Sequence, residues 1–112
     1  MLLASSAAVA AEPMAPKDIK AAFFDGQPFT AASLSGIKFK MTFKPDGTTM
    51  REPLAQPGTP TTGTWKLSAT GFCTTWQHGR PNCFTLVPSG DNRWSVQKLA
   101  TTIQTTIAIW SK

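Results

Sequence analysis

The residues of this 112-residue chain that are best suited to chemistry lie in one segment, residues 71–84, which reads GFCTTWQHGRPNCF. Its two cysteines, Cys73 and Cys83, flank Trp76 and the chain's single histidine, His78. Two cysteines and a histidine can hold a metal ion, exchange electrons or crosslink two strands. Each of these chemistries needs different partners, so the rest of the sequence decides between them.

A metal site or a redox pair finds no partners in the sequence. Zinc needs four protein ligands, or three and a water, and with one histidine the set would have to be completed by Asp46 or Asp91 without a recognisable pattern. A redox pair normally has CxxC spacing. We therefore expect no metal ion and no cofactor.

A disulfide between Cys73 and Cys83 fits the spacing. The connection then centres on residues 77–79, a three-residue hairpin loop in which Gly79 takes the left-handed position. Pro81 cannot donate a backbone hydrogen bond, but it has the same parity as Cys83, so the ladder within the hairpin stays intact. Closing a loop of this size stabilises a domain by about 2.5–3 kcal/mol in the chain-entropy model.

Motifs for catalysis are missing from the sequence. No serine lies in a GxSxG or comparable nucleophile setting, and no glycine-rich loop of the phosphate-binding kind occurs. Four of the six acidic residues occupy helix-start or turn positions, where capping explains them. These are Asp18, Asp25, Asp46 and Asp91. We predict that the protein is not an enzyme.

The first residues suggest the compartment. Residues 1–11, MLLASSAAVAA, are uncharged, small and apolar, and they offer small residues where a signal peptidase reads. We interpret them as the remnant of a secretory signal peptide, followed by a flexible arm at 12–16 and a single domain at 17–112. An exported domain meets oxidising conditions, which favours the disulfide and a periplasmic or secreted location. No stretch is long and apolar enough to span a bilayer.

The net charge of +5 comes from eleven basic and six acidic residues. Only Lys38, Lys40 and Lys44 cluster, and the other basic residues are scattered along the chain. A nucleic-acid-binding protein normally gathers its basic residues on one face. We therefore expect no nucleic acid partner and interpret the lysine row as the solvated face of a strand.

The pattern of apolar residues predicts one short helix followed by strands. Residues 15–24, APKDIKAAFF, form the helical candidate, of two turns at most, with Pro16 in its first turn. Residues 37–44 then alternate, with Ile37, Phe39, Met41 and Phe43 on the apolar face. The turn signal PDGT at 45–48 folds this strand back as a hairpin.

Further strands follow, separated by a proline- and glycine-rich loop at 55–63. Trp65 shares a face with Leu67, and Trp94 is in phase with Val96. The last segment is the best strand in the chain by β-branched content. It places on one face Ile103, Thr105, Ile107 and Ile109.

Seven or eight short strands after one helix predict a mainly β fold. We expect an antiparallel up-and-down barrel of the lipocalin-like kind, with the helix covering one open end, and a β-sandwich is the alternative.

The chain resembles a group of uncharacterised, exported alphaproteobacterial proteins. The resemblance is carried by PDGT, GTWKLS, GFCTTW and NCF, a G-T-W…C-x-x-W…C core, and covers about residues 17–98. The GTW run is also similar to the signature of lipocalin-type barrels, which include small secreted protease inhibitors with one disulfide. The resemblance implies a small exported barrel and brings no biochemical role with it. The threonine-rich segment ATTIQTTIAIW departs from the group's pattern, which leaves the pairing of the final strand open.

Two functions are consistent with such a domain. The first is a binding protein that takes an apolar or aromatic small molecule at the barrel mouth, with a site walled by Trp65, Trp76, Trp94 and Phe39. The second is an inhibitor or interaction partner of an exported enzyme or envelope component, which would use the arm at 12–16 or the loop at 55–63. Ordinary core filling also explains the tryptophans, since an eight-stranded barrel has little interior space.

Overall fold

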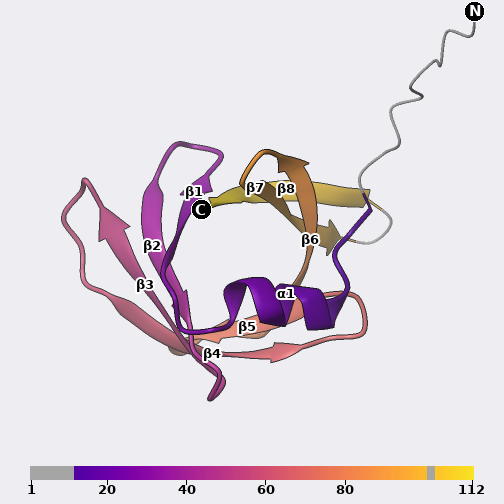
Figure 1. The fold of residues 1–112 in the computed structure, drawn as a ribbon. Helices are drawn as coiled ribbons and strands as arrows, with labels where there is room; N and C mark the ends of the chain where they lie inside the picture. Colours follow the sequence, from indigo (N-terminus) through magenta and orange to yellow (C-terminus); the bar gives the residue numbers. More distant parts are fainter. Residues whose placement is uncertain (1–11, 101–102) are drawn as a thin grey trace, which may run out of the picture.

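The computed structural model describes residues 12–100 and 103–112, which form one helix and eight strands. The helix α1 (Pro16–Phe23) precedes β1 (Phe29–Ser33), β2 (Lys38–Phe43), β3 (Thr48–Leu54), β4 (Thr61–Leu67), β5 (Phe72–Trp76), β6 (Asn82–Gly90), β7 (Arg93–Ala100) and β8 (Ile103–Ser111). Each strand pairs antiparallel with the next, and β8 pairs back onto β1, which closes a barrel (Figure 1). The predicted lipocalin-like, up-and-down barrel is confirmed, and closure rules out the sandwich. The predicted signal peptide at 1–11 lies outside the described residues.

The hairpin of β2 and β3 forms as its sequence predicts. Phe43 pairs with Thr49, and Met41 pairs with Arg51, so the alternating apolar residues of β2 face the interior. The turn is stabilised by Asp46, whose carboxylate accepts hydrogen bonds from the backbone N–H and the hydroxyl of Thr48. The register of this hairpin determines which side chains of β2 and β3 face the barrel interior.

Helix α1 covers one end of the barrel, as expected, and Figure 1 looks onto this end. Phe23 is fully buried, with its ring centre 5.1 Å from that of Phe29 and 4.8 Å from that of Trp94. The next residue, Phe24, stacks on Phe43 at 4.4 Å. The core of the barrel is therefore concentrated at the end that the helix covers, and the opposite end has no such cover among the described residues.

Strand β8 differs from the sequence-based prediction. Val96 of β7 pairs with Ala108, but the next residue of β7 skips one position of β8, so Ile107 is an extra residue without a partner. The bulge changes the alternation, and Trp110 and Ala108 face the interior while Ile109 lies on the opposite face. The predicted common face of Ile107 and Ile109 is wrong, because a bulge adds one residue to one strand only.

Candidate functional site at the uncovered end of the barrel

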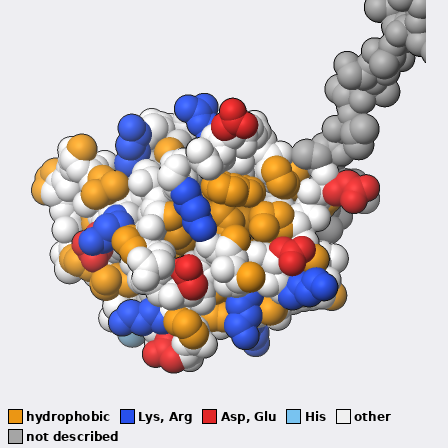
Figure 2. Space-filling model, in the orientation of Figure 1, with side chains coloured by type: hydrophobic (Ala, Val, Ile, Leu, Met, Phe, Trp, Pro, Cys, Tyr) orange, Lys and Arg blue, Asp and Glu red, His pale blue; other side chains and the backbone are white. Residues whose placement is uncertain are grey.

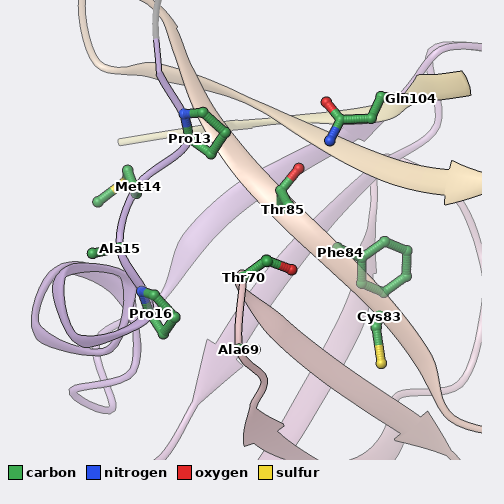
Figure 3. A pocket seen from close by; sticks show the side chains of 10 residues that line it. All are labelled: Pro13, Met14, Ala15, Pro16, Ala69, Thr70, Cys83, Phe84, Thr85 and Gln104. Atoms are coloured by element: carbon green, nitrogen blue, oxygen red, sulfur yellow. The ribbon is translucent and has the colours of Figure 1, made fainter. Parts of the chain in front are cut away.

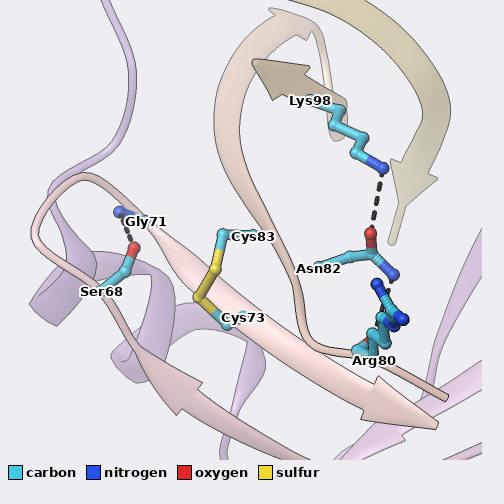
Figure 4. Close-up of a disulfide and its surroundings, with 7 residues drawn as sticks. All are labelled: Ser68, Gly71, Cys73, Arg80, Asn82, Cys83 and Lys98. Carbon is cyan, nitrogen blue, oxygen red and sulfur yellow. Dashed lines mark hydrogen bonds between the residues drawn. A yellow bond between two sulfur atoms is a disulfide. The ribbon is translucent and has the colours of Figure 1, made fainter. Parts of the chain in front are cut away.

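The two cysteines form the predicted disulfide. Cys73 and Cys83 are direct partners across β5 and β6, with their Cα atoms 3.9 Å apart, and their sulfur atoms are bonded (Figure 4). Their strand neighbours Phe72, Thr74 and Phe84 line the interior, so the bond lies on the outer wall of the barrel. The disulfide crosslinks β5 and β6 and does not enter the barrel interior.

The loop between these strands differs from the sequence-based prediction in its left-handed residue. His78, with φ of 61°, is the left-handed residue, and Gly79 is not. The N–H of Gly79 instead donates to the carbonyl of Trp76 at 2.7 Å, and an added Cβ on Gly79 would approach that same oxygen at 3.1 Å. The side chain of His78 is exposed. Within residues 12–100 and 103–112, no three His, Cys, Asp or Glu side chains gather in a way that could hold a metal ion.

A cavity of about 230 Å³ lies inside the barrel and opens at the uncovered end. It is formed where the inward-facing side chains of neighbouring strands do not fill the interior. Six aromatic side chains line it: Phe39, Phe43, Phe72, Trp76, Phe84 and Trp110. Small residues on β1 and β8, Ala31 and Ala108, leave the room that the rings do not occupy. The site is therefore an apolar cup whose floor is the packed core under α1.

The structure brings together two of the four residues predicted to form the ligand site. Trp76 and Phe39 line the cavity. Trp65 and Trp94 lie at the helix-covered end, where Trp65 packs 4.4 Å from Phe24 and Trp94 packs against the helix as described above. The predicted grouping is corrected accordingly. The alternation of a strand gives the face of a side chain, but its depth along the barrel depends on where the strand begins.

Arg51 lines the cavity and was not among the predicted site residues. Its guanidinium carbon lies 4.4 Å from the centre of the Trp76 ring and 5.7 Å from that of Phe39. Cations are attracted to the faces of aromatic rings at such distances. Partial burial lowers the pKa of Arg51 from its usual value, although arginine stays protonated in proteins. The hairpin symmetry around PDGT, which sets Arg51 opposite Met41, was the sequence signal for its position.

The rim of the uncovered end carries further basic residues. Lys98 pairs with Phe84 across β6 and β7, and its ammonium group donates to the side-chain oxygen of Asn82 at 3.0 Å (Figure 4). Arg80 lies in the exposed β5–β6 loop, next to the same rim. Lys98 and Arg80 therefore add positive charge to the β6 side of the cavity opening.

The acidic side chains lie elsewhere, and Figure 2 shows several of them around the helix-covered end. Asp18 is in α1, Asp25 follows it, and Asp46 and Asp91 lie in the turns that meet that end. Glu12 precedes the helix. Glu52 neighbours Arg51 in sequence but pairs with Lys40 at 3.5 Å on the outer face of β2 and β3.

A second hollow, of about 550 Å³, lies outside the barrel between the N-terminal arm and β6 (Figure 3). Residues 13–16, 69–70 and 83–85 line it together with Gln104. None of these lining residues is charged. The cavity inside the barrel is the stronger candidate because it combines aromatic walls with a placed charge.

Among the described residues, no helix has the length and apolar character to cross a membrane. Comparison of the chain with protein-family models, curated proteins and solved structures finds no match in any of the three. The candidate site therefore stands on its own geometry.

Proposed function

We propose that the protein is a small exported binding protein that takes an apolar or aromatic small molecule into the uncovered end of its barrel. The single observation that carries this proposal is the cavity of about 230 Å³ with aromatic walls. Small-molecule sites are typically concave and apolar with a few placed polar groups. The cup has this composition, since Arg51, Thr74 and Ser33 are its polar members.

The size of the cavity restricts the ligand. A cavity of about 150 Å³ accommodates benzene, whereas pockets for drug-sized ligands have about 300–1,000 Å³. The cup therefore suits one substituted ring or a short aliphatic chain, with the remainder of the molecule at the mouth. The proposed location is periplasmic or secreted, and the disulfide supports it because such bonds persist in oxidising compartments.

Calorimetric titration with a panel of neutral single-ring probes, among them 3-phenyl-1-propanol, tests the proposal. We expect saturable binding of one molecule per chain. The variant Ala31→Leu places additional atoms in the cavity and is expected to abolish this binding, because Ala31 is buried and lines the cup. The matched control is Ala32→Leu, which makes the same change one residue later, on the opposite face of β1.

Two results would reject the proposal. One is the absence of saturable heat with every neutral probe of the panel, at protein concentrations where millimolar binding is measurable. The other is equal affinity in Ala31→Leu and in the wild type, with both folded by circular dichroism. In addition to these two, loss of binding by folded Ala32→Leu would also reject the proposal, because binding would then depend on the outward face of β1.

The alternative function, inhibition of or binding to an exported protein, has less support. The N–H of Met14 donates to the carbonyl of Leu86 at 2.8 Å, which fastens the arm to the barrel wall. Residues 61–63 of the proline-rich stretch belong to β4, which leaves residues 55–60 as the exposed loop. This loop is the segment that a protein partner could reach most easily, and deleting it would test that function.

A further inference from the structure

The charge of Arg51 has no counterion in the described residues. All six carboxylate side chains belong to this part of the chain, and the ion pair found there joins Lys40 to Glu52. Within the same residues the guanidinium group donates no hydrogen bond to a side chain. A partly buried guanidinium presents five donors, and leaving them unpaired is costly. The group is held beside the Trp76 ring, and no carboxylate of the described residues neutralises it.

The surroundings of Arg51 make the uncovered end positive. Lys98 and Arg80 stand at or near the rim, whereas four aspartates lie at the helix-covered end. Glu52 already has a partner on the outer face of the barrel. A negatively charged molecule that approaches the opening therefore meets attractive charges and no competing carboxylate inside the cup. Such an arrangement raises the rate of encounter with anions.

From this geometry we propose that the ligand is a monoanionic amphiphile, a small carboxylate with an aromatic or short aliphatic body. Its body fills the apolar cup, and its carboxylate pairs with the guanidinium group of Arg51. This inference rests on the proposed function, because it assigns the head group of a molecule that the same cavity takes.

The chemistry of the site favours a carboxylate over other polar heads. The planar guanidinium fork matches the two oxygens of a carboxylate. One charge in the cup balances one negative charge, whereas the second charge of a phosphate would remain unpaired in an apolar site. The guanidinium group lies over the ring of Trp76, an attraction that holds it in the cup without pairing its charge.

The test compares two probes that differ only in their end group, 3-phenylpropanoate and 3-phenyl-1-propanol. Titration of the full chain at neutral pH is expected to give at least about tenfold tighter binding of the carboxylate, because a hydrogen bond between charged groups contributes about this much to affinity. This preference is expected to shrink in high salt, because screening weakens the ion pair and leaves apolar contacts unchanged.

The variant Arg51→Met removes the charge and keeps an unbranched side chain beside Trp76. We expect it to lose the preference for the carboxylate, so that both probes bind it with similar affinity. Arg51→Lys keeps the charge without the planar fork and is expected to retain part of the preference. Arg93→Met is the matched control, since Arg93 begins β7 at the opposite end of the barrel, and it is expected to change neither affinity.

The outcomes separate this inference from the proposed function. Equal affinity of the wild type for the two probes, or an unchanged preference in Arg51→Met, would overturn the role of Arg51 while the apolar cup stands. Failure of both probes to bind the wild type would overturn both. Loss of alcohol binding in Arg51→Met, with an unchanged melting temperature, would also contradict the inference, because it would assign Arg51 a role in packing rather than in head-group recognition.

Discussion

Trp76 reaches Arg51 across the inner face of β4, and the residue of β4 between them is Gly63. Gly63 pairs with Trp76 on one side and with Thr49, two residues before Arg51, on the other. A Cβ at Gly63 would lie 2.5 Å from the carbonyl oxygen of Thr75 and 3.0 Å from the Trp76 ring. The absence of a side chain at this position lets the indole lie close to the strand, where it meets the guanidinium group.

This relationship predicts the effect of Gly63→Ala. The added methyl group must displace backbone as well as the indole, so we expect the variant to be about 1–3 kcal/mol less stable, the usual cost of overpacking. It is also expected to weaken binding of 3-phenylpropanoate, because Trp76 no longer positions Arg51. Urea denaturation and calorimetric titration measure the two effects. Wild-type stability together with wild-type affinity would show that the glycine is not needed for the contact.

The disulfide is predicted to act on stability and not on the cavity. Replacing both cysteines, Cys73→Ser with Cys83→Ser, is expected to lower the free energy of unfolding by about 2.5–3 kcal/mol. Because the bond lies on the outer wall, the fraction of the variant that remains folded should bind the neutral probe with wild-type affinity. Guanidinium denaturation of both proteins measures the first effect. A fall in the free energy of unfolding of less than about 0.5 kcal/mol would contradict the stabilising role of the disulfide. Loss of probe binding by the folded variant would show that the disulfide shapes the cup.

Helix α1 is predicted to be part of the core and not an accessory cover. Phe23→Ala removes a fully buried ring that contacts Phe29, Trp94 and Trp110, and we expect it to cost about 3–5 kcal/mol. Lys17→Ala on the exposed side of the same helix serves as the control and is expected to change stability by less than about 0.5 kcal/mol. Thermal or urea unfolding gives both values. Similar stability of the two variants would mean that the helix does not close the barrel.

The turn at Asp46 predicts a specific dependence on pH. Hydrogen bonds from the Thr48 side chain and backbone hold the pKa of the Asp46 carboxyl below its ordinary value of 3.8. A folded-state pKa below the unfolded value means that the stabilisation is complete above the unfolded pKa and is lost as the pH falls through the folded one. The stability difference between the wild type and Asp46→Ala should therefore shrink in acid.

Carbon-detected NMR titration of the Asp46 carboxyl group measures this pKa directly. We expect a midpoint below 3.8 in the folded protein and a return toward 3.8 in Thr48→Val, which removes the hydroxyl donor but keeps the backbone N–H. A midpoint at or above 3.8 in the wild type would show that the carboxylate does not accept these bonds in solution.

Local patterns were sufficient to predict the helix, the hairpins and the disulfide. The PDGT turn fixes the partners of β2 and β3, and from it the inward position of Arg51 could have been derived by counting outward from the turn. The cysteine spacing likewise fixed the β5–β6 register, although the left-handed residue of that loop is His78 and not Gly79. These features depend on residues that are close in sequence.

One feature that the sequence did not predict depends on barrel closure. The depth of Trp65 and Trp94 follows from how every strand is offset around the barrel, a relation completed by the pairing of Ala31 with Trp110 between the first and last strands. This depth has no local signal in the sequence, because it is set by contacts between distant segments. The bulge at Ile107 lies within the β7–β8 hairpin, where the sequence has no glycine to mark it.

NMR mapping of methyl and amide shifts during titration with 3-phenylpropanoate locates the ligand site in the barrel. Binding at the uncovered end is expected to give saturable shifts at Met41, Ala108 and Trp76, which line the cup, and unchanged positions for Ile19 of α1, which is buried at the other end. Shifts that cluster around Ile19 or the second hollow outside the barrel, with the cup residues unmoved, would show that the uncovered end is not the ligand site.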